Sequence, residues 1–319
     1  MKKWILFISA LLFTGLIVTS CASKSGNQTV SKTQQKKEIP VVEIEEPEPS
    51  PEEIFLDSLK DIKIQFTNIP DKTKKGKAFT SPYEIYVTKE EAPLAGFNFT
   101  LEIPQGKEDS TIVFDKIDMT TDENGLALYN PEIPAFAAQT KVSAAPTIPQ
   151  GLNIQASQIE PYRANADFLC ESDIVSKGAI MFVFEYNENG RSPKNSYDIL
   201  SGLRKKGVYQ IGNAPLSDTE YINASKEKIY KENYAYVGSD FGYLIGGTIK
   251  FTNPVEQNED GTYTASMVAD MYGIEMKTGK VIYEDQITYK DSGTNWNYAV
   301  SNCRNKLTQL VVDSIMFGL

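Results

Sequence analysis

An apolar segment near the start of the chain limits which residues can belong to a water-soluble fold. The segment runs from residue 4 to residue 18, follows two lysines, and ends in a short polar stretch at Cys21. A membrane-spanning helix needs about 20 apolar residues, so this shorter run after positive charges is typical of a secretory signal peptide. We therefore expect residues 1–20 to be removed and the folded part to begin further along the chain.

The cysteine at the end of this segment needs its own explanation, because an ordinary cleaved signal does not require a thiol there. The stretch "LFTGLIVTSCASKSG" resembles the signals of bacterial lipoproteins, in which the cysteine thiol carries a diacylglycerol. Val18 and Ser20 stand where that family usually has Leu and Gly or Ala. The resemblance implies that Cys21 is lipidated and anchors the protein to a membrane by acyl chains, each buried CH₂ contributing about 0.8 kcal/mol. A plain secreted protein and an uncleaved anchor are the alternatives.

Composition excludes several classes of function. The chain has no histidine, which removes Ser-His-Asp and Cys-His catalysis and most zinc sites. Its formal net charge is −10, so it lacks the basic surface that nucleic-acid binding requires. Carboxylate pairs, Ser-Lys pairs and hard-metal sites remain as possible chemistry, and no cofactor is expected.

Two further cysteines, Cys170 and Cys303, remain after Cys21 is assigned to the lipid. In an export compartment disulfides are permitted, so the two residues could form a disulfide. Alternatively they are two buried thiols, and a reactive thiol is the third possibility.

The rest of the chain divides by composition and pattern. Residues 21–57 include "EIPVVEIEEPEPSPEE" and have almost no apolar periodicity, so we expect a disordered Pro/Glu-rich tether. Residues 58–150 contain short alternating runs between turn clusters, which predicts an all-β sandwich. The expected strands are 62–69, 83–87, 97–103 and 111–117.

This β segment resembles bacterial immunoglobulin-like domains. The resemblance is carried by "APLAGFNFTLEIPQG", "MTTDENGLALYNP" and "QTKVSAAP". That family mostly supplies spacers and adhesive modules, so the resemblance implies no catalytic residues.

After a connector at 151–177, residues 178–319 change to strand–helix alternation. A near-continuous apolar strand, "GAIMFVFEY", is followed by a helix that starts at Asn195 or Ser196 and stops at Gly207. A hairpin around "KTGK" and a terminal helix from about Thr294 complete the pattern. The expected order is β-α-β-α-β-β-β-α, which makes the protein α+β overall.

The motifs "FGYLIGGTIKF" and "ADMYGIEMKTGKVIYED" resemble a group of envelope lipoproteins. The group contains the curli-secretion pore lipoprotein, the outer-membrane activators of penicillin-binding proteins, and the N-terminal domain of the Tol translocation protein. The resemblance implies this fold and an envelope location, expected at the outer membrane on its periplasmic face or surface. The chain lacks the long alternating strands that a curli-type pore would need.

Other motifs have both a structural and a functional interpretation. Three acidic glycine turns, at 121–125, 187–190 and 258–261, lack the ligand spacing of a calcium loop and are expected to be Asx-Gly turns. Gly246 and Gly247 indicate a bulge or a close helix contact rather than a phosphate site. Glu275 and Glu284 flank the hairpin, and an acid/base role for them is the less favoured interpretation.

Tyrosines are concentrated between residues 221 and 243. Helical spacing favours core packing for this group, but any exposed members, with Tyr221 and Tyr236 as candidates, would be partner-binding aromatics.

These observations favour a non-enzymatic lipoprotein, an adaptor or activator that binds an unidentified envelope protein and, through its lipid, a membrane. The alternatives are a carboxylate-dependent glycan hydrolase, which would need two carboxyls about 5–9 Å apart in a groove, and an adhesive surface lipoprotein.

Overall fold

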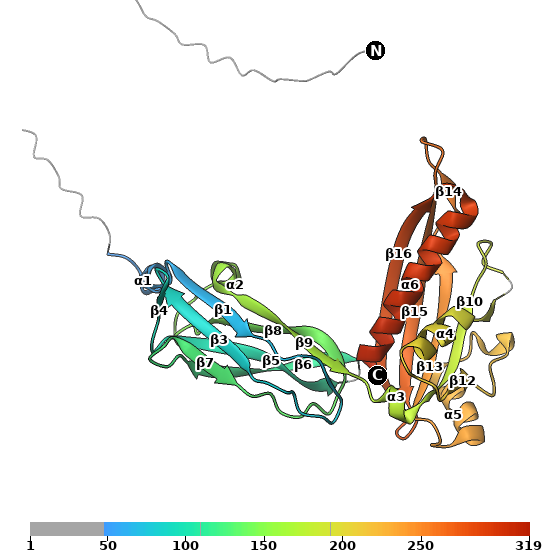
Figure 1. Ribbon diagram of the computed structural model, residues 1–319, viewed down its shortest axis with the longest axis horizontal. Helices are drawn as coiled ribbons and strands as arrows, with labels where there is room; N and C mark the ends of the chain where they lie inside the picture. Colours follow the sequence, from blue (N-terminus) through green and yellow to red (C-terminus); the bar gives the residue numbers. More distant parts are fainter. Residues whose placement is uncertain (1–47, 109, 192) are drawn as a thin grey trace, which may run out of the picture. The chain divides into compact units, whose positions relative to one another are not determined.

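The computed structural model describes residues 48–108, 110–191 and 193–319, of which residues 49–319 form one compact unit (Figure 1). The described residues have a mixed α+β fold with three β-sheets. Among the described residues, none of the helices has the length and apolarity needed to span a membrane. Cys21 and the signal segment lie outside the described residues.

Residues 50–172, called here the N-terminal β region, form two sheets around one apolar core. The four-stranded sheet has the order β1-β3-β4 with β7 paired to β3, and the five-stranded sheet has the order β2-β9-β8-β5-β6. Both sheets contribute buried side chains to the same core, including Ile85 from one and Leu101 from the other. The elements are α1 (Pro51–Ser58), β1 (Ile62–Asn68), β2 (Thr73–Lys74), β3 (Tyr83–Lys89), β4 (Ala92–Pro93), β5 (Asn98–Glu108), β6 (Thr111–Thr120), β7 (Leu126–Tyr129), β8 (Ala138–Pro146), α2 (Ala156–Ile159), η1 (Glu160–Tyr162) and β9 (Ala164–Glu171).

Each of the four strands expected between residues 62 and 117 is present, but two segments differ from the sequence analysis. Helix α1 occupies the end of the expected tether, because Ser50 and Glu53 form a capping box and Pro51 is favourable at the first turn. Strand β9 lies in the expected connector 151–177, where it pairs along β8 and buries Phe168 and Cys170. The division into separate domains at 58–150 and 178–319 stays a prediction.

Residues 173–319, called here the C-terminal α+β region, are built on one mixed sheet. Strands β12, β10 and β13 are parallel neighbours, and β15 and β16 continue the sheet in antiparallel fashion. The elements are α3 (Ile174–Lys177), β10 (Ala179–Glu185), β11 (Lys194–Asn195), α4 (Tyr197–Lys205), β12 (Ile211–Asn213), η2 (Thr219–Tyr221), α5 (Lys226–Val237), β13 (Tyr243–Phe251), β14 (Glu256–Gln257), β15 (Tyr263–Glu275), β16 (Val281–Gly293) and α6 (Trp296–Gly318). The short elements α3, β11, η2 and β14 are additions to the expected order.

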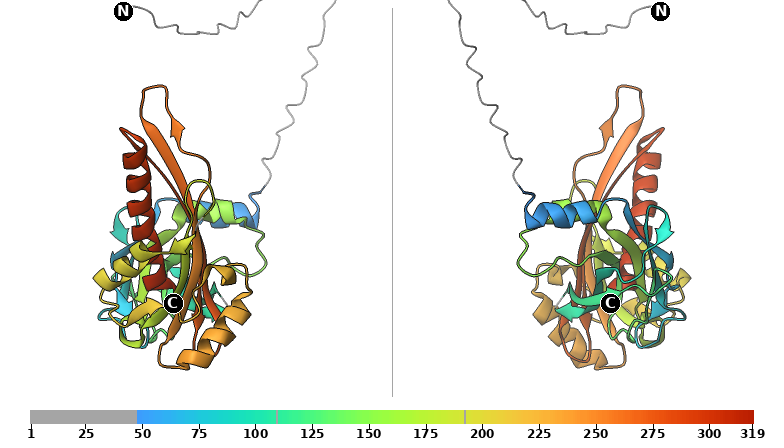
Figure 2. Two further views of the ribbon diagram at one scale, coloured as in Figure 1. Left: turned by 90° about the vertical axis from the view of Figure 1, so that its right-hand side faces the viewer. Right: turned by 90° about the vertical axis from the view of Figure 1, so that its left-hand side faces the viewer.

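Helices cover both faces of this sheet (Figure 2). Strand β10 alternates its side chains, so Met181 and Val183 pack with buried residues of α4 and α6. Ile180 and Phe182 point to the opposite face, where they share a core with Ile229 of α5. This alternation explains why the strand is apolar throughout.

The predicted helix caps are partly confirmed. Ser196 caps α4 by accepting a hydrogen bond from the Ile199 backbone N–H at 3.2 Å. Tyr197, the first residue of α4, is 74% exposed. Trp296 is 40% exposed, because it is the first residue of α6 and precedes the buried residues of that helix, which begin at Ala299.

The paired glycines of β13 have a different cause from the expected bulge or helix contact. Gly246 is paired across the sheet with Tyr272 of β15, and a Cβ on Gly246 would lie 2.0 Å from Cζ of that ring. A Cβ on Gly247 would lie 2.4 Å from the backbone oxygen of Asp270. The glycines therefore accommodate a cross-strand aromatic ring and a close strand backbone.

Candidate functional site

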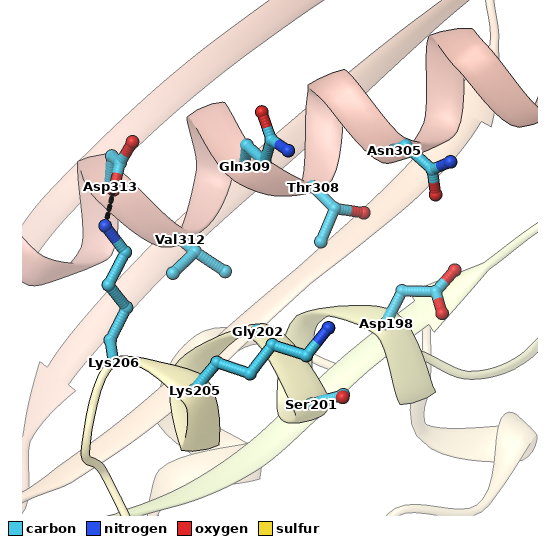
Figure 3. A pocket seen from close by; sticks show the side chains of 10 residues that line it. All are labelled: Asp198, Ser201, Gly202, Lys205, Lys206, Asn305, Thr308, Gln309, Val312 and Asp313. Atoms are coloured by element: carbon cyan, nitrogen blue, oxygen red, sulfur yellow. Dashed lines mark ion pairs between the residues drawn. The ribbon is translucent and has the colours of Figure 1, made fainter.

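A groove runs between α4 and α6 on one face of the C-terminal sheet (Figure 3). Its volume is about 680 Å³. The helix surfaces that line it carry mainly polar side chains, among them Asp198, Ser201 and Lys205 of α4 and Asn305, Thr308 and Gln309 of α6.

The groove exists because the two helices touch at its floor. Gly202 of α4 lies against Val312 of α6, where a Cβ would come within 2.7 Å of Val312 Cγ2. Larger side chains on either side of this contact then form the walls. The two helices run alongside one another, so residues at matching positions along their axes face one another across the groove.

Charges of both signs line the groove. Lys206 Nζ lies 2.8 Å from Asp313 Oδ1 and closes one end, while Asp198 lies beside Asn305 towards the other end. The side chain of Lys205 extends along the groove towards Ser201. Both members of the Lys206–Asp313 pair are about half exposed, so the pair contributes only about 0–1 kcal/mol to stability. This ion pair therefore does little to hold the fold together.

A buried carboxylate fixes the positions of both helices. Glu185, at the end of β10, is 5% exposed and accepts a hydrogen bond from Ser196 Oγ at 2.5 Å. Its second oxygen lies 3.6 Å from Nε of Arg304 on α6. Because Ser196 caps α4, one carboxylate connects β10, α4 and α6. This carboxylate therefore ties both helices that line the groove to the sheet.

The two candidate partner-binding tyrosines differ in their surroundings. Tyr236 of α5 is 69% exposed. Tyr221 is half-buried against the α5-side core, and Lys228 Nζ lies 5.5 Å from its ring centroid. Both lie on the α5 side of the sheet, away from the groove. Core packing accounts for Tyr243, which is 1% exposed.

The remaining candidate residues have structural partners. Two of the three glycine turns are confirmed as Asx turns, because Asp122 and Asp260 each accept a hydrogen bond from the backbone N–H two residues further on. Asn187 instead accepts from the backbone N–H of Arg191, four residues further on. Glu275 accepts a hydrogen bond from Thr278 in the hairpin, and Glu284 pairs with Lys226. Within the described ranges, no three His, Cys, Asp or Glu side chains are grouped as metal ligands.

Cys170 and Cys303 are free thiols, and each is fully buried. Cys170 belongs to the core of the N-terminal β region, and Cys303 belongs to the α4–α6 side of the C-terminal core. Each thiol donates to a backbone oxygen, that of Phe136 at 3.1 Å and that of Tyr289 at 3.3 Å. The structure thus corresponds to the expectation of two buried thiols.

We predict that neither thiol reacts with iodoacetamide at pH 8 until the protein unfolds. Burial raises the pKa of Cys170 to about 12 and also raises the pKa of Cys303, so little reactive thiolate is present. In a Cys21→Ala background, mass spectrometry should find no label on the native protein and two labels after denaturation. No label after denaturation without reductant would show a disulfide instead.

The residues of the groove were not singled out from the sequence. Polar residues on one side of a helix look like an ordinary solvated face. The sequence signal for this helix contact is Gly202, because a glycine within an otherwise helical pattern often marks a close packing contact.

Comparison with known proteins adds a family match for this region. Residues 178–316, less than half of the chain, match the family model described as the TP0693-like lipoprotein, C-terminal domain. The match supports a bacterial lipoprotein. It does not distinguish among the envelope lipoproteins named in the sequence analysis. None of the curated proteins matches the chain.

Several solved structures align with parts of the chain. A PelC dodecamer from Paraburkholderia phytofirmans aligns over 43% of this chain and 86% of its own, at 15% identity and a TM-score of 0.28. Lipoprotein GNA1162 from Neisseria meningitidis aligns over 43% of this chain and 96% of its own, at 14% identity and a TM-score of 0.26. Protein CT253 from Chlamydia trachomatis covers 44% and 97%, at 11% identity and a TM-score of 0.28.

Proposed function

We propose that the protein is a non-enzymatic, lipid-anchored envelope lipoprotein that binds another envelope protein through the α4–α6 groove. Cys21 carries the anchor, and the outer membrane is the proposed location. The N-terminal β region, interpreted as an immunoglobulin-like module, acts as a spacer. The role is that of an adaptor or activator, as in the lipoprotein group that the C-terminal motifs resemble.

The observation that carries the proposal is the groove itself. It is a groove of about 680 Å³ lined by hydrogen-bonding side chains and by charges of both signs, and the buried Glu185 network links its two helices to β10. Such a surface can pair with polar groups of a protein segment, while the Gly202–Val312 contact holds the two helices close together at its floor. The partner segment is expected to present an acidic group to Lys205.

A charge reversal tests this assignment. Lys205→Glu should reduce capture of the partner from solubilised envelopes at least tenfold, because it places a like charge against the partner's acidic group, and tenfold corresponds to about 1.4 kcal/mol. The matched control is Lys306→Glu, which makes the same charge change at an exposed position of α6 that does not line the groove.

Both variants should keep the melting temperature of the parent, since exposed substitutions usually change stability by less than about 0.5 kcal/mol. Equal capture by the Lys205→Glu and Lys306→Glu proteins would remove the groove from the proposal.

A further inference from the structure

A second, smaller cavity adjoins the groove near the N-terminal end of α6. Its volume is about 340 Å³, and it shares Asp198 and Asn305 with the groove. Three asparagines, two carboxylates, a serine and one arginine supply its polar groups, and Phe251 and Trp296 contribute aromatic rings. None of the described residues that line the groove is aromatic, so this cavity suits a different class of ligand.

The indole ring of Trp296 is held in place as a wall of the cavity. Its Nε1–H donates to Glu188 Oε2 at 3.1 Å, and Glu188 Oε1 accepts the Val255 backbone N–H at 2.7 Å. Trp296 remains 40% exposed. An exposed ring fixed by its edge offers a flat apolar face without further loss of side-chain freedom on binding.

Arg304 lies at the inner side of the same cavity. Its Nε is buried without a hydrogen-bond partner and lies 3.6 Å from the buried Glu185 carboxylate, which neutralises its charge. The side chain is 31% exposed, and a guanidinium has five N–H donors in a fixed plane. Arg304 can therefore donate hydrogen bonds to a ligand without requiring that the ligand be an anion.

The lining groups select among ligand classes. An anion would face Glu188 and Asp198, and an apolar ligand would leave the amides and the guanidinium desolvated without partners. A neutral polyhydroxyl ring avoids both the repulsion from the carboxylates and the unpaired polar groups. Its hydroxyls donate to the carboxylates and accept from the amides and the arginine, and its C–H face packs on the indole ring. We propose that this cavity binds a saccharide unit of a glycan. Its volume is at the lower end of the range of about 300–1,000 Å³ for ligand pockets.

The sequence offers a direct reporter for this site. The chain has two tryptophans, Trp4 in the signal segment and Trp296 in the cavity, so a protein that begins at residue 22 has Trp296 as its sole tryptophan. Residues 49–319 form one compact unit, which this truncation leaves whole. The probes are chitotetraose, an N-acetylglucosamine tetramer, and cellotetraose, its glucose counterpart. At least one should cause a saturable change in Trp296 emission.

Two cavity variants and two controls define the site. Asn297→Ala and Arg304→Lys should each weaken binding of the responding probe about tenfold. The first variant removes a side-chain amide. The second removes the planar guanidinium donors but keeps the positive charge beside Glu185. Lys306→Ala, on the same helix, and Tyr236→Ala, on α5, should leave the affinity unchanged.

The inference is overturned if neither tetrasaccharide gives a saturable change, or if both cavity variants bind as tightly as the parent. It is also overturned if tetra-alanine, tested in parallel as a neutral peptide, produces the response and the saccharides do not. The Lys205→Glu protein should bind the saccharide normally, so failure here and failure of the groove assignment are separate outcomes.

Discussion

Replacement of Cys21 by alanine should move the protein from the detergent phase to the aqueous phase when Triton X-114 extracts are separated. The lipid is expected to be attached through the Cys21 thiol, and alanine offers no sulfur to accept it. Because each buried CH₂ contributes about 0.8 kcal/mol, loss of the acyl chains removes almost all membrane affinity. The effect should be close to all-or-none.

Cys170→Ala is the matched control, since that thiol is buried in the N-terminal core and is unavailable for lipid attachment. Its phase partitioning should equal that of the parent protein. If the Cys21→Ala protein stays in the detergent phase and keeps residues 1–20, the chain is held by an uncleaved anchor and the lipoprotein assignment of Cys21 is wrong.

A second large effect is expected at the centre of the C-terminal sheet. Gly247→Ala places a Cβ 2.4 Å from the backbone oxygen of Asp270 and 3.1 Å from Cα of Met271. These atoms belong to the neighbouring strand, so they can move only if the sheet distorts. We expect a loss of about 2–3 kcal/mol in the free energy of unfolding, measured by chemical denaturation.

Gly212→Ala provides the comparison in the same sheet. This glycine lies in β12, has no heavy atom within 4 Å of the added Cβ, and does not adopt a positive φ. Its substitution should change stability by less than about 1 kcal/mol. Equal stability of the Gly247→Ala and Gly212→Ala proteins would contradict the close strand contact.

The strands were predictable where the local pattern agreed with the final packing. The alternation in 62–69 and 83–87 corresponds to β1 and β3, which bury one face in the β core. Helix α1 was missed because the Pro/Glu composition outweighed the capping signal of Ser50 and Glu53. Strand β9 was missed because its alternation is short and follows a polar, proline-containing stretch.

Features that depend on contacts between distant segments were not predictable. The pairing of Gly246 with Tyr272 requires the register of β13 on β15, which a single sequence does not reveal. The groove requires α4 and α6 to touch at Gly202 and Val312. The tyrosine cluster also divides between core and surface, because its members lie on different elements: Tyr243 of β13 is buried, whereas Tyr236 of α5 is exposed.

The most direct test of the proposed binding role is site-specific photocrosslinking in intact envelopes. The photoreactive residue benzoylphenylalanine would replace Ser201 or Gln309 in the groove, and Lys231 or Tyr236 on α5 as controls on the opposite face of the sheet. The proposal predicts that both groove positions give the same crosslinked envelope protein, that Lys205→Glu reduces its yield at least tenfold, and that the α5 positions do not give it. Crosslinking of that protein from α5 alone would contradict the proposal, as would glycan hydrolysis by purified protein that is lost on Glu275→Gln or Glu284→Gln.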